Sequence, residues 1–246
     1  MKNISKHAII LAAGKGTRMK SEKPKCACEI LGKPMITHIV EACKEAGLDK
    51  IVVVVGYKRE YIEDILGSTV QYAFQDEQLG TGHACKVTKE LLKDCYGTTV
   101  IVPGDMPLIG AENIKKLVDY HEKNHNAMTI ASCIFENPYS YGRIIHNKDN
   151  NVVSIVEEKE ATEEQKKVKE INTALYAVDN QLLFSSLDQI NNNNNKGEYY
   201  LTDIVSILSK DHKVDALVYD YDYHLVGIND PDTLQEVVKM YEDTKD

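Results

Sequence analysis

The segment that most constrains the fold is residues 51–55, where an isoleucine is followed by four valines. A strand with one solvated face alternates apolar and polar side chains, so an unbroken apolar run indicates a parallel strand buried on both faces. Residues 7–11 and 98–102 are similar short runs. Segments with helical periodicity alternate with these runs, at 34–47, 58–66 and 80–94. This alternation predicts an α/β fold: a Rossmann-like, doubly wound, mostly parallel mixed sheet with helices on both faces.

The second half of the chain is less regular. It contains four further strand-like segments, at 127–134, 143–147, 152–158 and 171–178. Residues 149–151 are typical of a hairpin turn, and the charged stretch 160–170 favours a helix. Five consecutive asparagines at 191–195 predict a mobile surface loop. A last helix is expected over 231–243, with Asp230 as N-cap and Pro231 at its first position.

Length and charge narrow the class of protein. The 246 residues, without repeat or linker, predict one composite domain. The net charge of −9 argues against nucleic acid or an anionic membrane as a partner. No apolar run reaches the roughly 18 residues of a membrane helix, and the first residues lack a signal sequence, so we expect a cytoplasmic protein. The cysteines have no zinc-type spacing and are expected to be reduced, small apolar residues: Cys26, Cys28, Cys43, Cys85, Cys95 and Cys133.

A glycine-rich stretch follows the first predicted strand. It reads Leu11, Ala12, Ala13, Gly14, Lys15, Gly16, Thr17, Arg18 and Met19. Glycines there let backbone N–H groups approach an anion, and Lys15, Arg18 and Lys25 add cations. The stretch matches neither the Walker A pattern nor G-x-G-x-x-G, because Met19 takes the last glycine position. Alone it fits a tight turn with solvated lysines as well as a triphosphate site.

The same stretch, with Pro24-Lys25 and residues 31–35, resembles the signature of the sugar nucleotidyltransferase family. The resemblance implies a nucleotidyltransferase (GT-A-like) fold with a small β-rich sugar-binding part. It also implies that residues 11–16 wrap the nucleotide phosphates. Arg18 and Lys25 would neutralise the triphosphate and the reacting centre, with Lys15 as a less certain helper.

Later segments resemble one branch of the family, the N-terminal uridylyltransferase domain of the bacterial bifunctional enzyme that makes UDP-N-acetylglucosamine. These segments are residues 75–84, 104–108, 141–144, 155–159, 170–173, 197–203 and 227–230. They occur in the family's order and extend the resemblance from about residue 7 to 235. The segments G-E-Y-Y-L-T-D at 197–203 and E-I-N-T at 170–173 are far more specific than the glycine-rich stretch.

Asp105 and Asn229 are the candidate magnesium ligands. Asp105 follows a buried strand, at the sheet edge where ligands gather, and a carboxylate suits Mg²⁺. Asn229 resembles the second ligand of the family. Considered alone, Asp105 is better interpreted as a turn-capping residue than as a metal ligand, and Asn229 as a turn residue. Only their joint match favours the metal.

The resemblance also assigns base and sugar positions. Gln75, Gly80 and Thr81 are expected on the nucleotide, since a side-chain amide can both donate to and accept from a pyrimidine. The expected sugar-binding residues are Gly142, Glu157, Asn172, Tyr199 and Thr202. Glu157 and Asn172 would bond the hydroxyl and acetamido groups, and Tyr199 would form a wall of the pocket. Each has a plain structural alternative: a solvated carboxylate, a turn asparagine and a core tyrosine.

Some residues are given little functional weight, and others depart from the family pattern. His121 and His125 stand four apart on a predicted helix, but a solvated face is favoured over a metal pair. His83 is interpreted as helix packing. The departures are Pro103, where an aromatic or small residue is usual, Ala174, where glycine is common, and Cys26-Ala27-Cys28. They leave the sugar and base preferences open, and Ala174 could crowd the sugar.

The sequence therefore predicts an Mg²⁺-dependent transfer of UMP from UTP to N-acetylglucosamine 1-phosphate. Residues 1–110 would bind the nucleotide, 111–230 the sugar, and 231–246 would form a C-terminal helix. The alternatives are uridylyl or cytidylyl transfer to glucose or galactosamine 1-phosphate, or a non-catalytic regulator that binds nucleotide sugars. The hexapeptide repeats of the bifunctional enzyme are missing, so neither acetyl transfer nor a β-helix trimer is expected. The oligomeric state stays open.

Overall fold

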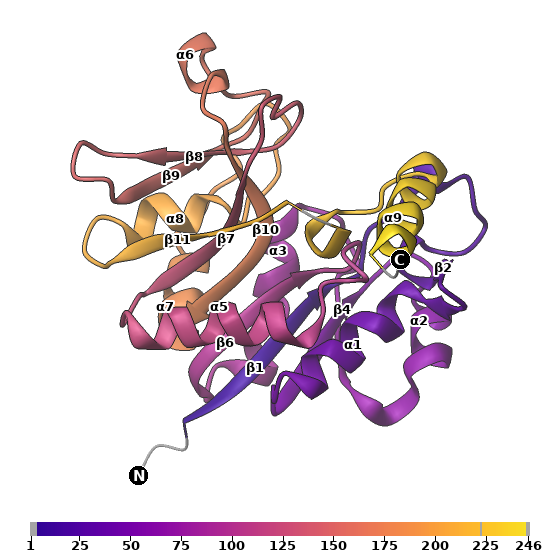
Figure 1. Cartoon of the computed structure of the whole chain (residues 1–246). Coiled ribbons are helices and arrows are strands. Elements are labelled where there is room, and N and C mark those ends of the chain that lie inside the picture. The colour runs from indigo at the N-terminus through magenta and orange to yellow at the C-terminus, as the bar shows by residue number, and fades with distance from the viewer. Residues whose placement is uncertain (1–3, 222, 245–246) are drawn as a thin grey trace.

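The computed structural model describes residues 4–221 and 223–244. A nine-stranded sheet runs through the molecule (Figure 1), with its main strands in the order β11-β7-β10-β6-β1-β4-β5 and with β8 and β9 attached beside β10. Its strands are β1 (Ile4–Leu11), β4 (Lys50–Val55), β5 (Gln71–Phe74), β6 (Tyr96–Pro103), β7 (Met128–Ile134), β8 (Arg143–His146), β9 (Val152–Val156), β10 (Glu170–Asp179) and β11 (Val214–Tyr219). A small separate sheet pairs β2 (Glu29–Ile30) with β3 (Lys33–Pro34).

The sheet is mixed but mostly parallel, as predicted. Strand β1 pairs in parallel with β4 and β6, and β4 pairs in parallel with β5. Strand β10 runs antiparallel to β6 and β7, whereas β11 and β7 are parallel. Valines 52 to 55 are fully buried, because helices cover both faces of the sheet at that point.

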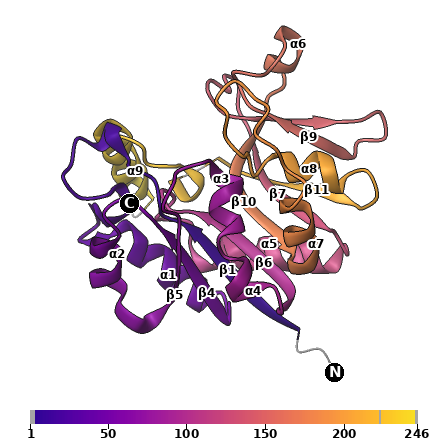
Figure 2. The same cartoon turned by 180° about the vertical axis from the view of Figure 1, so that it is seen from behind.

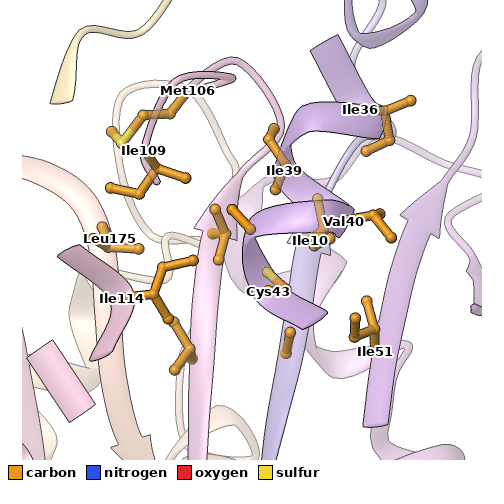
Figure 3. Close-up of a cluster of buried hydrophobic side chains, with 14 of the residues drawn as sticks. Ile10, Ile36, Ile39, Val40, Cys43, Ile51, Met106, Ile109, Ile114 and Leu175 are labelled. Atoms are coloured by element: carbon orange, nitrogen blue, oxygen red, sulfur yellow. The ribbon is translucent and has the colours of Figure 1, made fainter. Parts of the chain in front are cut away.

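Helices pack on both faces of the sheet. One face carries α1 (Met35–Glu45), α2 (Arg59–Leu66) and α5 (Ala111–Lys123). The other carries α3 (Thr81–Lys86), α4 (Lys89–Leu92), α7 (Asn180–Leu187) and α8 (Asp203–Leu208), as Figure 2 shows from behind. On β1, Ile10 packs into the first layer (Figure 3) and its neighbour Ile9 into the second. Alternate side chains of one strand thus anchor the two layers.

The remaining elements are the 3₁₀ turns η1 (Thr17–Met19), η2 (Lys25–Ala27), η3 (Gly67–Thr69) and η4 (Tyr223–Leu225), and the helices α6 (Glu163–Lys166) and α9 (Pro231–Asp243). Helix α9 has the predicted start: the Asp230 side chain accepts from the Thr233 amide and Pro231 follows. Helix α9 packs beside β2, well away from the β8–β9 hairpin (Figure 1). None of the helices in the described ranges is long and apolar enough to cross a membrane.

Several sequence expectations need correction. The helix expected at 80–94 is two helices, α3 and α4, separated by a turn at 87–88. Within 160–170 only Glu163–Lys166 is α-helical, held by a Thr162 capping box. The strand expected at 152–158 ends at Val156. Strands β5 and β11 and helices α7 and α8 were not predicted, since they are short or lie at the sheet edges, where the apolar pattern is weak.

The two histidines of the α5 region were also misread. His121 is buried, only 4% exposed, and its Nδ1 lies 3.1 Å from the Thr129 Oγ1, so it does not stand on a solvated face. Burial lowers the pKa of His121 to about 4. His125 lies beyond the end of α5, with φ of +51°, and is exposed. The pair therefore does not share a helix face. All six cysteines are free, as expected.

Candidate active site

Three adjoining cavities lie at the carboxyl ends of β1 and β6. The central cavity, of about 280 Å³, is bordered by Leu11, Gly14, Lys25, Cys26, Thr81, Pro103, Gly104, Asp105, Glu157, Asn172, Ala174, Tyr176, Leu201 and Thr202. The outer cavity, of about 530 Å³, adds Arg18, Gly142 and Asn229. The third, of about 270 Å³, contains Gln75, Gln78 and Gly80 and is called the Gln75 cavity. Most predicted site residues therefore meet along one continuous cleft.

The glycine-rich loop begins where β1 ends. Leu11 O accepts from the Gly104 amide at 3.0 Å, and the Ala12 amide donates to Val54 O at 2.9 Å. Beyond this point the main-chain N–H groups of 13–18 make no hydrogen bond to any residue that the structure describes. Free amides in a turn that follows a strand are suited to bind an anion such as a phosphate.

Lys25 reaches into the cleft from η2, and Gly16 makes room for it. Gly16 has φ of +60°, and a Cβ atom there would collide with Lys25 Cβ. Lys25 Nζ lies 2.7 Å from Asp105 Oδ2 and 3.1 Å from Asn229 Oδ1. The side chain is 15% exposed, so its charge is only partly screened by water. The lysine thus brings a cation directly to the two candidate metal ligands.

Arg18 is joined to the same group by tertiary packing. Its Nη2 donates to Asn229 Oδ1 at 2.9 Å. Met19, the next residue, is buried against Ile228 and Val237 of the α9 region, in a small apolar cluster. The cluster therefore holds the loop against the segment that carries Asn229. Beyond it, the Thr233 amide bonds to Asp230 and lowers the pKa of that carboxyl.

The donor set at Asp105 and Asn229 fits a magnesium ion. Asp105 Oδ2 and Asn229 Oδ1 converge, since both lie within hydrogen-bonding distance of one atom, Lys25 Nζ. A carboxylate and an amide oxygen are hard ligands, and Mg²⁺ commonly takes one or two protein oxygens beside waters and substrate phosphates. Within the described residues no group of three His, Cys, Asp or Glu side chains is placed to hold a metal. A site of this kind would therefore be completed by substrate.

Gln75 is fixed in a buried position by the protein itself. Its Nε2 donates to Gly80 O at 3.0 Å and lies 3.1 Å from His83 Nδ1. Gly80 O can only accept, so the NH₂ group must face it. The amide oxygen of Gln75 makes no hydrogen bond to the described part of the chain, and the residue borders the Gln75 cavity. It is therefore available to accept a hydrogen bond from a ligand.

Gly80 and Thr81 hold this cavity against the segment near residue 200. Gly80 has φ of +109°, and a Cβ atom there would lie 2.5 Å from Tyr199 O. Thr81 Oγ1 accepts from the Leu201 amide at 3.0 Å. Only glycine fits at position 80, because both the backbone angle and the close approach exclude a side chain.

The candidate sugar residues form one wall of the central cavity. Thr202 Oγ1 donates to Glu157 Oε1 at 3.3 Å. Burial raises the pKa of Glu157, and the Thr202 bond offsets part of that rise. Asn172 is 8% exposed. Its side-chain Nδ2 donates to the Tyr176 hydroxyl at 2.8 Å, and its main-chain N–H donates to Gly142 O. These contacts fix the direction of each polar group before any ligand binds.

Four predicted residues, Ala12, Lys15, Gly16 and Tyr199, border none of the three cavities. Lys15 is exposed and borders a depression beside Tyr57 and Arg59. Tyr199 packs against the apolar cluster of α3 and α7 and is not among the residues that border the three cavities. Tyr199 contacts the site through its backbone. Its main-chain N–H donates to Leu79 O, and its carbonyl oxygen accepts from the Gly82 N–H.

Other residues of the site were not singled out as functional from the sequence. His83 orients Gln75, and Gln78 Nε2 donates to Ala13 O at 3.3 Å. Their position inside the segment 75–84 was the available signal. Cys26 borders the central cavity, but burial raises the pKa of its thiol to about 12. The thiol is therefore protonated at neutral pH and is no nucleophile.

A doubly wound sheet with a phosphate-suited loop at its carboxyl edge is the arrangement of nucleotide-binding α/β proteins. The sequence matches the nucleotidyl transferase family over residues 7–230, and the chain belongs to that family. It is 42% identical to the bifunctional protein GlmU of Staphylococcus saprophyticus over 97% of this chain and 53% of that protein. It is 47% identical to the bifunctional protein GlmU of Caldanaerobacter subterraneus over 95% of this chain and 51% of the relative.

The chain thus spans about half the length of the curated relatives it matches. Among solved structures, UDP-glucose pyrophosphorylase complexed with UDP-glucose superposes with a TM-score of 0.78. The match covers 98% of this chain and all of that one, at 19% identity. This likeness shows that the fold is that of an α/β nucleotidyltransferase.

Proposed function

We propose that this protein transfers UMP from UTP to N-acetylglucosamine 1-phosphate and releases pyrophosphate. The observation that supports this most strongly is the meeting of Lys25, Asp105 and Asn229 beside a loop with free amides. A cleft of this kind suits a reaction between two phosphate-bearing anions. The relatives named bifunctional protein GlmU agree with a sugar-phosphate nucleotidyltransferase.

The chemistry needs position and positive charge more than a nucleophilic side chain. An oxygen of the sugar phosphate is already ionised, so it attacks the α-phosphorus directly. The bond from that phosphorus to the bridging oxygen breaks, and pyrophosphate leaves with the electron pair. Lys25 and Arg18 would offset the charge that develops, since fixed cations cost no reorganisation at the moment of reaction. A magnesium ion on Asp105 and Asn229 would supply further neutralisation of the phosphates.

The Gln75 cavity supports uracil over cytosine. Its free acceptor is the Gln75 amide oxygen, because the NH₂ group is engaged by Gly80 and His83. Uracil carries a ring N–H donor where cytosine carries an acceptor, so cytosine would leave two acceptors facing each other. An unpaired buried polar group costs about 1–3 kcal/mol. Under this proposal residues 1–110 bind the nucleotide and residues 111–230 the sugar.

The test is a pyrophosphate-release assay with UTP, Mg²⁺ and a panel of sugar 1-phosphates, with CTP as the competing nucleotide. We expect turnover with UTP and N-acetylglucosamine 1-phosphate, and at least tenfold lower kcat/KM with CTP, on the order of the cost of one unpaired group. Preference for glucose or galactosamine 1-phosphate would overturn the sugar assignment. No turnover with any pair at high enzyme concentration would overturn the reaction itself.

A further inference from the structure

Five residues border both the central and the outer cavity, so they form the passage between the two. They are Pro103, Asp105, Glu157, Asn172 and Ala174. Three of them are polar and have roles in the proposed reaction. Pro103 and Ala174 are apolar and have none so far. Their place at the junction means that a molecule occupying both cavities must pass between them.

Pro103 and Ala174 come from neighbouring strands, β6 and β10, and both border this passage. In the β6–β10 ladder Tyr176 pairs with Ile101, antiparallel. The ladder ends at that pair, two residues short of both Ala174 and Pro103. The width of the passage on this side therefore depends on the side chains at 103 and 174.

The backbone at Ala174 is in a conformation that alanine seldom adopts. Its φ is +65°, in the left-handed region that favours glycine. Strand β10 is irregular here, since its register against β7 shifts between Asn172 and Tyr176. Such bulges occur next to active sites, where they redirect side chains. A strained residue beside a cavity points to a functional reason for keeping it.

The strained segment is held on both sides, so the methyl group has little freedom to move. The Ala174 amide donates to Asn172 Oδ1 at 3.0 Å. Thr173 Oγ1 donates to Ala131 O of the neighbouring strand at 2.8 Å. Ala174 also packs against the apolar cluster below the cavity. A passage with fixed walls selects by size, because closely packed surroundings cannot absorb an extra carbon.

We propose that Ala174, together with Pro103, is a specificity-determining residue that limits the size of the sugar substituent accepted at this passage. The inference rests on the proposed function, which places a sugar 1-phosphate between Lys25 and the Glu157–Asn172 wall. Glu157 and Asn172 border the passage, whereas Lys25 borders only the central of the two cavities. The methyl group of Ala174 then discriminates against a bulky substituent such as acetamido relative to hydroxyl, and sets how strongly the larger sugar is accepted.

The experiment compares the wild type with Ala174→Gly and Ala174→Ser, which remove and add one heavy atom. The measured quantity is the ratio of kcat/KM for N-acetylglucosamine 1-phosphate to that for glucose 1-phosphate, with UTP and Mg²⁺. We expect the ratio to rise about tenfold in Ala174→Gly and to fall about tenfold in Ala174→Ser, the size of effect that one carbon has in a tight pocket. The glycine variant is compatible with the backbone angle, so it is expected to fold.

Two further variants separate size selection from relief of backbone strain. His125→Gly replaces another residue with positive φ, +51°, at an exposed position far from the cleft, and should leave the ratio unchanged. Pro103→Ala should also shift the ratio. Combined with Ala174→Gly it should give a non-additive change, because both residues border the same passage.

An unchanged ratio in both Ala174 variants, with wild-type circular dichroism, would overturn this inference and leave the proposed function standing. An equal shift in His125→Gly would also overturn it, since the effect would then come from stability. A wild-type protein that turns over no sugar 1-phosphate would overturn the proposed function and, with it, the inference.

Discussion

Around Thr99 of β6, polar side chains are buried and hydrogen-bonded; at the carboxyl end of β6, they face cavities. Asn180 is fully buried, accepts from Thr99 Oγ1 at 2.6 Å and donates to Leu92 O and Cys95 O. Among the described residues, the Asn229 side chain accepts from Arg18 and Lys25 of the cleft and donates to Gly227 O. The two asparagines belong to the same chain and differ in what surrounds them.

The difference teaches how to separate structural from functional polarity in this molecule. Buried polar groups are mostly paired in folded proteins, and around Thr99 and Asn180 the protein supplies the partners. At the carboxyl end, the loop amides and the Gln75 oxygen have no partner among the described residues, and Gly14 and Gln75 border a cavity. Substitutions in the first region should therefore lower stability, and substitutions in the second should lower activity.

The largest expected effect is at Lys25. Replacing it by methionine removes a cation beside Asp105 while the apolar stem is kept. We expect kcat to fall about 10²–10³-fold, as when one charge-stabilising donor is removed from an active site. Lys6→Met is the matched control: this lysine pairs with Glu122 at 3.4 Å near the amino end of β1. Activity should stay within roughly twofold of wild type there, as for a surface ion pair. Equal losses of activity in Lys25→Met and Lys6→Met would contradict the distinction between the two ends of the sheet.

The two asparagines give the next effect. Asn180→Ala should lower the free energy of unfolding by about 2–3 kcal/mol, because it leaves buried partners unpaired. KM and kcat at low temperature should hardly change. Asn229→Ala should do the reverse: a stability change below about 1 kcal/mol and a marked loss of turnover. Denaturant unfolding and steady-state kinetics on both variants measure the contrast. If the Asn229→Ala variant were destabilised but fully active, Asn229 would have a structural role like that of Asn180.

The smallest expected effect concerns acid stability and His121. Its folded-state pKa is about 4, below the ordinary value of 6.5. Between those values the unfolded chain binds more protons than the folded one, so stability falls as pH falls through this window. From pH 7 to pH 5 the wild type should lose about 2 kcal/mol more than His121→Gln, which cannot titrate. Denaturant unfolding of both proteins at pH 7 and at pH 5 tests this. An equal loss of unfolding free energy in the wild type and in His121→Gln would show that burial does not lower the pKa of His121.

Much of the fold could be predicted because its signals are local. The apolar run on β4 and its counterparts on β1 and β6 require burial on both faces, whatever surrounds them. Asp230 and Pro231 mark a helix start through their own chemistry. Edge strands such as β5 could not be predicted in this way. An edge strand pairs with one neighbour only, so it can form with a weak apolar pattern.

The sequence by itself determined which chemical groups the protein has and where its buried strands run, because side-chain type and apolar spacing act within a few residues. Only the tertiary structure decided which groups meet. Lys25, Asp105 and Asn229 come together because β1 and β6 are adjacent and because apolar contacts hold the α9 region against the loop. It also decided the lowered pKa of His121, the raised pKa of Glu157 and the place of Ala174 and Pro103 at the junction of two cavities. Burial, pairing and passage width depend on neighbours distant in sequence.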